Sequence, residues 1–201
     1  MTSPRTLACL ALLALTAAGA HAQHAPGGSG PPLLTTAPAE ARQLDFLVGQ
    51  WELVAEPKVS MLAATFHGQP KLPGVWKAWR ALDGFAIEDE MRLTDESGNP
   101  RSLAKSLRIY DRSARRWSST TLDVYRARFQ AATGEWKGGQ MTFTARGTDG
   151  DGKAFLMRVR FYDIGPNGFR WQQDRSYDDG RTWDEGTLRI VAKRVAAKAP
   201  R

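Results

Sequence analysis

Apolar and polar residues alternate along most of the chain between Leu44 and Val195. In four segments the apolar side chains keep to every second position, with few interruptions. These series are Phe85, Ile87, Met91 and Leu93; Leu103, Leu107 and Ile109; Met141, Phe143 and Ala145; and Phe155, Met157, Val159 and Phe161. A period of two predicts β-strands that bury one face and expose the other.

Short clusters of turn-forming residues separate these segments, at 95–100, 148–153 and 165–168. Such short connections predict an antiparallel meander in which sequential strands are neighbours. A long meander avoids exposed edges by closing on itself. We therefore predict an all-β fold, an antiparallel up-and-down β-barrel of about eight to ten strands. Only residues 44–48 and 58–66 are candidates for short helices.

Residues 1–22 have the pattern of a cleavable signal peptide. Arg5 precedes an apolar run from Leu7 to Ala18, and Ala20-His21-Ala22 fits the small-x-small cleavage rule, with cleavage after Ala22. This predicts a periplasmic or secreted protein. The single cysteine, Cys9, lies inside this segment, so the mature chain would have neither a disulfide nor a thiolate site.

The rest of the chain divides by composition. Residues 23–43 are rich in Gly, Pro and Ala and are expected to form a disordered tether. Residues 44–195 have the length of one domain and are expected to form the barrel. Residues 196–201 form a short basic tail.

The charge balance argues against a nucleic-acid partner. The chain has 28 Lys and Arg against 21 Asp and Glu, a formal net charge of +7. These charges are scattered and do not form a basic stripe with interleaved aromatic residues, which nucleic-acid binding requires. We expect no transmembrane segment in the mature chain, because the one long apolar run is removed with the signal peptide.

No metal site is expected either. Asp149-Gly150-Asp151-Gly152 begins like a calcium-binding loop. Lys153 and Arg160, however, stand where the loop would need oxygen ligands. We predict an ordinary turn here.

A dense turn motif runs from Ser176 to Trp183, with the sequence Ser-Tyr-Asp-Asp-Gly-Arg-Thr-Trp. It resembles the Asp-box of sialidases and several unrelated β proteins, in which it is a folding device remote from the chemistry. Asp and Gly suit a tight corner, and Trp183 can cover the hairpin. We therefore predict a structural role for this motif.

Other motifs carry a broader resemblance. Phe46-x-x-Gly49-x-Trp51 resembles the Gly-x-Trp opening of lipocalin-type (calycin) barrels, whose Trp plugs the closed end. Most of the domain resembles a bacterial calycin-like family of unknown function, through motifs that occur in the same order: Leu82-Asp83-Gly84, Arg108-x-Tyr110-Asp111, Trp117, Trp171 and the Asp-box. Nitrobindins belong to the same broad group and bind haem through a histidine near the C-terminal end. This chain has no histidine after His67, so we expect no cofactor.

Polar residues interrupt the apolar face at four predicted positions. A hairpin centred on Ser97 would place Asp89 opposite Lys105 on the inward face. A hairpin centred on Pro166 would pair Phe161 with Trp171, Val159 with Gln173, and Met157 with Arg175. Asp89, Lys105, Gln173 and Arg175 are therefore the candidate polar groups of the barrel interior.

These residues support several hypotheses. Lys105 and Arg175 would suit the carboxylate or phosphate head of an amphipathic ligand. The apolar body of that ligand would contact Phe85, Ile87, Met91, Phe143, Met157, Phe161 and Trp171. Alternatively, the polar residues satisfy one another as a buried network, or Asp89 acts as a general base of an enzyme. A barrel with a filled interior would instead work through its surface.

Overall fold

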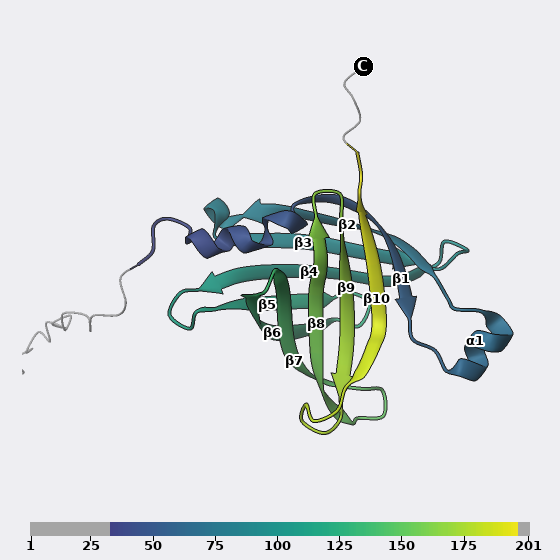
Figure 1. Cartoon of the computed structure of the whole chain (residues 1–201). Coiled ribbons are helices and arrows are strands. Elements are labelled where there is room, and N and C mark those ends of the chain that lie inside the picture. Colours follow the sequence, from purple (N-terminus) through teal and green to yellow (C-terminus); the bar gives the residue numbers. More distant parts are fainter. Residues whose placement is uncertain (1–32, 197–201) are drawn as a thin grey trace, which may run out of the picture. The chain divides into compact units, whose positions relative to one another are not determined.

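The computed structural model describes residues 33–196, which contain a closed barrel of ten antiparallel strands (Figure 1). Each strand pairs with the next along the chain, and β1 pairs with β10 to close the barrel. The prediction of an up-and-down β-barrel is confirmed. The predicted signal peptide, residues 23–32 of the predicted tether and residues 197–201 of the predicted tail lie outside the described residues.

The strands are eight to twelve residues long, and hairpins connect most of them. Their bounds are β1 Gly49–Pro57, β2 Leu72–Ala81, β3 Ala86–Thr94, β4 Pro100–Asp111, β5 Arg116–Asp123, β6 Arg128–Lys137, β7 Gln140–Thr148, β8 Ala154–Gly165, β9 Gly168–Ser176 and β10 Asp184–Arg194. In Figure 1, β7 to β10 cross β2 to β5 at a steep angle.

The 3₁₀-helix η1 (Ala39–Leu47) lies at the end of the barrel where β1 begins. Ala41, Leu44 and Leu47 are buried, and the last two belong to the main apolar core. The predicted boundary between tether and domain at residue 43 is therefore wrong. The buried apolar side chains of η1 recur at a helical spacing, and the first of them, Ala41, lies before residue 44. The folded part therefore already includes Ala39 to Gln43.

Beneath η1 the core is a cluster of buried aromatic side chains. Trp51, Trp76, Trp117, Phe161 and Phe169 are all buried there. Phe169 contacts Trp51 edge-on, with ring centroids 4.8 Å apart, and contacts Trp76 in the same way at 5.7 Å. This end of the barrel is closed by aromatic packing, which confirms that Trp51 plugs it.

The predicted register of the β8–β9 hairpin is confirmed. Phe161 pairs with Trp171, Val159 with Gln173, and Met157 with Arg175. Phe161 and Val159 are buried, so this face points into the barrel. Trp171, Gln173 and Arg175 therefore belong to the inner wall.

The predicted register of the β3–β4 hairpin is wrong by one residue. Thr94 pairs with Pro100, as a hairpin centred on Ser97 requires, but the register then shifts, and Leu93 pairs with Ser102. The extra residue in β4 is a β-bulge, and it reverses the two faces of that strand. Asp89 consequently pairs with Ser106 instead of Lys105.

The bulge also changes which side chains of β4 reach the core. Ser106 and Arg108 are buried on the inner face. Leu107 and Ile109 are 38% and 40% exposed on the outer wall, although their alternation predicts a core face. The apolar series of β4 is thus an outer-wall series.

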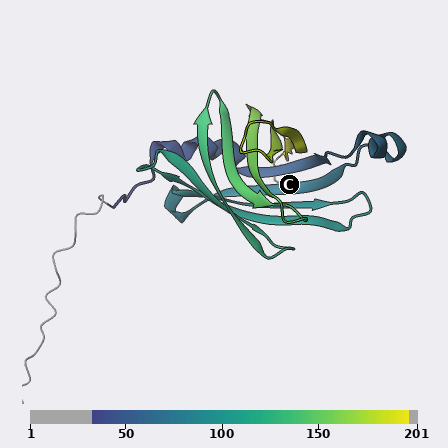
Figure 2. The ribbon, with the colours of Figure 1, turned by 90° about the horizontal axis from the view of Figure 1, so that it is seen from below.

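The β1–β2 connection contains helix α1 (Met61–His67), none of whose residues is buried. Ser60 caps its first turn by accepting a hydrogen bond from the backbone N–H of Ala63 at 3.2 Å. Figures 1 and 2 both show α1 projecting away from the barrel wall. None of the helices described in residues 33–196 has the length and apolar character needed to cross a membrane.

Candidate functional site

A buried ion pair lies on the inner wall, between β3 and β4. The carboxylate of Asp89 is 2% exposed and pairs through Oδ2 with Nη1 of Arg108, which is 7% exposed. The other oxygen, Oδ1, accepts a hydrogen bond from the indole N–H of Trp76 at 3.0 Å. One oxygen of Asp89 thus accepts a hydrogen bond, and the other is engaged by the ion pair alone. We call Asp89 and Arg108 the floor pair.

Aromatic rings surround the guanidinium of the floor pair. Cζ of Arg108 lies 5.7 Å from the ring centroid of Phe143 and 6.0 Å from that of Phe161. Burial lowers the pKa of Arg108 to about 10 because the charged form loses its hydration. The guanidinium nevertheless remains charged at neutral pH, facing the Asp89 carboxylate.

Three buried guanidinium nitrogens of the inner wall have no hydrogen-bond acceptor among the described residues. They are Nε and Nη1 of Arg108 and Nε of Arg175, of which Nη1 contacts Asp89 only through the ion pair. A buried donor without an acceptor costs about 1 to 3 kcal/mol. The barrel interior therefore has unused capacity to donate hydrogen bonds.

The half of the barrel away from η1 is less tightly filled. Several inward-facing side chains there are only half-buried, although the barrel wall surrounds them: Leu72, Met91, Ala104, Thr121, Ala132, Met157, Trp171, Gln173 and Arg175. Because the wall is closed, solvent must reach these side chains from the end opposite η1. The floor pair lies deeper, between this accessible region and the aromatic core.

Small residues dominate the inner face of four consecutive strands. They are Ser102, Ala104 and Ser106 on β4, Ser119 and Thr121 on β5, Ala132 and Gly134 on β6, and Ala145 and Gly147 on β7. An eight-stranded barrel is just wide enough for side chains to fill, and diameter grows with strand number. In a ten-stranded barrel such short side chains take up little of the interior, and aromatic rings fill part of the difference: Phe143 packs against Gly134, and Phe155 packs against Gly147.

The structure separates the eight predicted site residues into two groups. Seven of them face the interior: Asp89, Phe143, Met157, Phe161, Trp171, Gln173 and Arg175. Lys105 instead lies on the outer wall, where Nζ is 3.2 Å from Oε2 of Glu88. The bulge in β4 explains this difference, and it also hid Arg108, the actual partner of Asp89. Phe85, another apolar residue that was expected to contact the ligand, lies just before the first residue of β3.

The polar residues of β9 are dispersed along the inner wall. Gln173 donates from Nε2 to the hydroxyl of Thr187 at 3.2 Å. The guanidinium of Arg175 lies over the ring of Phe155, with Cζ 4.6 Å from the centroid. They do not form a single network with the floor pair.

Arg175 also lines a concavity of about 470 Å³ at the end opposite η1. The other lining residues come from the segment before α1 and from the ends of β9 and β10: Lys58, Val59, Ser60, Tyr177, Asp184 and Thr187. Lys58 forms an ion pair with Asp184 at 2.5 Å. Polar side chains and one inner-wall guanidinium thus surround the entry to the lumen at this point.

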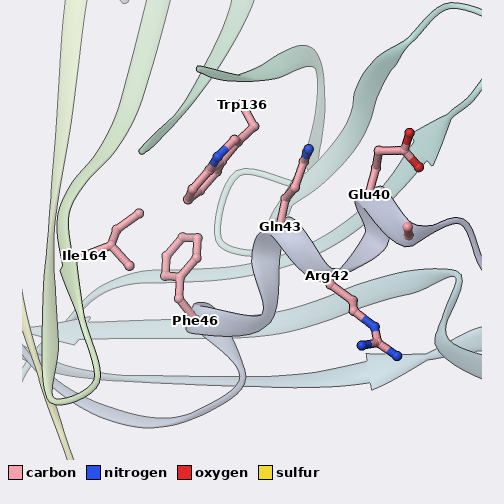
Figure 3. Close-up of a pocket in the computed structure, with 7 residues that line it drawn as sticks. Glu40, Arg42, Gln43, Phe46, Trp136 and Ile164 are labelled. Atoms are coloured by element: carbon pink, nitrogen blue, oxygen red, sulfur yellow. The ribbon is translucent and has the colours of Figure 1, made fainter. Parts of the chain in front are cut away.

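A second, open concavity of about 600 Å³ lies against η1 at the closed end. Figure 3 shows Phe46, Trp136 and Ile164 converging on it, while Arg42 points away. Phe46 and Trp136 pack with centroids 6.0 Å apart. The aromatic core separates this concavity from the floor pair.

A second buried carboxylate lies on the outer wall and escaped sequence analysis. Asp174 is fully buried and accepts from Gln172 and the backbone N–H of Gly186 at Oδ1, and from Arg158 and Arg160 at Oδ2, all within 2.7 to 3.0 Å. Burial raises the pKa of Asp174, but these hydrogen bonds outweigh it and hold the pKa below its ordinary value. All its contacts are internal, which marks it as a structural element.

The Asp-box is likewise self-contained. Ser176 donates to Asp178 at 2.7 Å and accepts from the backbone N–H of Gly180 at 2.7 Å. The indole of Trp183 donates to the carbonyl of Gly180 and stacks on Arg158, 4.2 Å from Cζ. The motif thus fastens the β9–β10 connection to the outer wall, as its structural interpretation requires.

Comparisons with known proteins support the fold and go no further. No family model and no curated protein matches the chain. Among solved structures, the chain is similar to that described as "Crystal Structure of Rv2717c from M. tuberculosis", with a TM-score of 0.53. The two sequences are 14% identical, and the match covers 80% of this chain and 99% of the other. A likeness at this identity shows a shared barrel fold and says nothing about activity.

Proposed function

We propose that this protein is an exported β-barrel that binds a small amphipathic molecule in its lumen, through the end opposite η1. The observation that carries the proposal is the gradient of exposure along the inner wall. Side chains near η1 are buried in an aromatic core, whereas Met91, Ala104, Met157 and Trp171 face inward and remain half-exposed. Apolar side chains that line an accessible interior favour the burial of an apolar ligand.

The chemistry of the lumen fits a molecule with one polar end. Near the entry, the accessible wall combines Met157 and Trp171 with the half-buried small side chains of Ala104, Thr121 and Ala132. Deeper in the lumen lies the floor pair, with its unused donor on Arg108. An amphipathic ligand could bury its chain against the wall and direct its polar end to the floor pair.

The same geometry disfavours catalysis by Asp89. A general base must be free to take a proton from the substrate. Both oxygens of Asp89 are occupied, one by the indole of Trp76 and the other by the guanidinium of Arg108. Binding is therefore the better-supported function of this site.

We also propose a calycin relationship and an extracytoplasmic location. The first is supported by Gly49-x-Trp51, because Trp51 plugs the closed end and donates from Nε1 to the carbonyl of Leu47 at 2.8 Å. The second is supported by the signal-peptide pattern of residues 1–22. Together they suggest a barrel that encounters its ligand in the periplasm or outside the cell.

Native mass spectrometry tests the binding proposal. Protein isolated from its own host without denaturation should carry an additional mass that organic solvent releases. Ala132→Phe would fill the lumen from the inner face of β6 and should abolish the additional mass. Ala131→Phe is the matched control, because Ala131 is exposed on the outer face of the same strand.

The outcomes separate the hypotheses. If the wild-type barrel carries no additional mass and takes up no amphiphile, the lumen is not a binding site. If both alanine variants lose the ligand equally, the site is not in the lumen. A filled barrel that works through its surface would then be the better interpretation.

A further inference from the structure

We infer that the polar end of the ligand is a carboxylate, and that Arg108 of the floor pair binds it. This inference rests on the proposed function, since it requires a ligand in the lumen. It specifies the chemical class of that ligand.

The floor pair has spare donors but no spare charged acceptor. A guanidinium has five N–H donors and no acceptor. In Arg108, Nη1 faces Asp89, while Nε is buried without an acceptor among the described residues. Each oxygen of Asp89, by contrast, already faces a donor. A ligand group that satisfies this site must therefore supply an oxygen acceptor.

The hydroxyl groups beside the floor pair can supply a further donor. Ser106, which pairs with Asp89 across the strands, shares a hydrogen bond with Thr121, with an Oγ–Oγ1 distance of 2.9 Å. Two hydroxyls carry two hydrogens, and this contact uses only one of them. The second hydrogen is available for another acceptor.

The charge of the site distinguishes among ligand heads. An ammonium group would lie next to the Arg108 guanidinium and be repelled by it. A phosphate dianion would leave excess negative charge in a region of low dielectric, because Asp89 already neutralises one positive charge. A carboxylate accepts charge-assisted hydrogen bonds and adds one excess negative charge, where a phosphate dianion adds two.

Arg175 reinforces the same preference at the entry. It faces inward from β9, and its buried Nε has no acceptor among the described residues. It also lines the concavity at the end opposite η1. An anionic ligand entering from this end would therefore pass one guanidinium before it reaches the other.

A series of probes with the same alkyl chain tests the inference. Isothermal titration calorimetry would measure the dissociation constants of decanoate, decanol and decylamine with the purified protein, below the concentrations at which the probes aggregate. Decanoate should bind about tenfold more tightly than decanol, the effect of roughly one charge-assisted hydrogen bond. Decylamine should bind most weakly.

Variants then assign the preference to Arg108. Asp89→Asn removes the competing carboxylate and should tighten decanoate binding. The double variant Asp89→Leu with Arg108→Met should bind decanoate and decanol equally. Lys105→Met, which removes a positive charge from the outer wall, is the matched control and should keep the wild-type preference. Near-ultraviolet circular dichroism would verify that each variant is folded.

The results distinguish failure of this inference from failure of the proposed function. If all three probes bind with similar affinity, the lumen binds apolar chains but Arg108 does not recognise a carboxylate. The same conclusion follows if the folded double variant keeps its preference for decanoate. If no probe binds, both the inference and the proposed function are wrong. The wild-type series alone is sufficient for this distinction, even if a variant fails to fold.

Discussion

The guanidinium of Arg194 lies over the indole of Trp51, with Cζ 4.0 Å from the ring centroid. The two residues come from β10 and β1 and pair across the seam that closes the barrel. Arg194 also donates to the carbonyls of Pro166 and Val48, at 2.6 and 3.0 Å. A single side chain thus connects the closing strand pair, the β8–β9 turn and the end of η1.

Trp51→Ala should therefore destabilise the barrel strongly. Removing this buried ring leaves a cavity under η1 and should lower the free energy of unfolding by about 3 to 5 kcal/mol. Urea denaturation followed by circular dichroism would measure the change. Trp79→Ala is the control, since Trp79 is 39% exposed on the outer wall and should cost about 1 kcal/mol or less. Equal effects of the two substitutions would refute the plug role of Trp51.

Truncation should locate the start of the folded domain. Deleting residues 23–34 should leave the melting temperature unchanged, because this Gly- and Pro-rich segment has little to pack. Extending the deletion through Leu47 removes buried Leu44 and Leu47 and should lower the melting temperature by well over about 5 °C. Differential scanning calorimetry would compare the two. A large loss from the shorter deletion would show that the segment before η1 contributes to the fold.

The barrel class and the register of the β8–β9 hairpin could be predicted from local sequence patterns. The alternation of apolar and polar residues predicted the strands. The turn at Gly165 to Gly168 predicted the β8–β9 pairing, because the register beyond this turn still follows a hairpin centred on Pro166. This placed Trp171, Gln173 and Arg175 on the inner wall. These are the features for which a period of two and a short turn contain enough information.

The floor pair could not be predicted, because its geometry depends on one bulged residue. The turn around Ser97 is where the sequence places it, yet the register changes just beyond Thr94. No residue in this segment predicts the bulge. The apolar series Leu103, Leu107 and Ile109 instead predicts that the outer face of β4 lies in the core. The buried carboxylate of Asp174 escaped for a related reason, since its partners lie on three different strands, β8, β9 and β10.

The Asp-box should make stability sensitive to acid. Hydrogen bonds from the hydroxyl and then the backbone N–H of Thr182 lower the pKa of Asp178 from 3.8 to about 2. As the pH falls, the unfolded chain takes up this proton first. The contribution of Asp178 is therefore complete above about pH 3.8 and is lost between pH 3.8 and 2.

Denaturation midpoints measured across this pH range would test the effect. The pKa values of Asp95 and Asp111 are also lowered, chiefly by hydrogen bonds from Asn99 and Ser113 respectively, and act in the same direction. Asp178→Asn should therefore reduce the pH dependence without removing it. An unchanged pH profile in this variant would contradict the role of Asp178.

The floor pair should also contribute to stability in the absence of a ligand. Asp89→Leu should lower the free energy of unfolding by about 3 to 5 kcal/mol, because it leaves the Arg108 guanidinium buried without its partner. Arg108→Met should cost a similar amount by stranding the carboxylate. The double variant should recover much of the loss, since two apolar side chains of similar length need no partner.

Lys105→Met provides the matched control for this double-mutant cycle. Its ion pair with Glu88 is exposed on the outer wall, so its loss should cost at most about 1 kcal/mol. The coupling energy between positions 89 and 108 should therefore be large, and that between positions 89 and 105 should be close to zero. The opposite pattern would mean that β4 keeps the register of an unbulged hairpin, which would return Lys105 to the lumen and remove Arg108 from it.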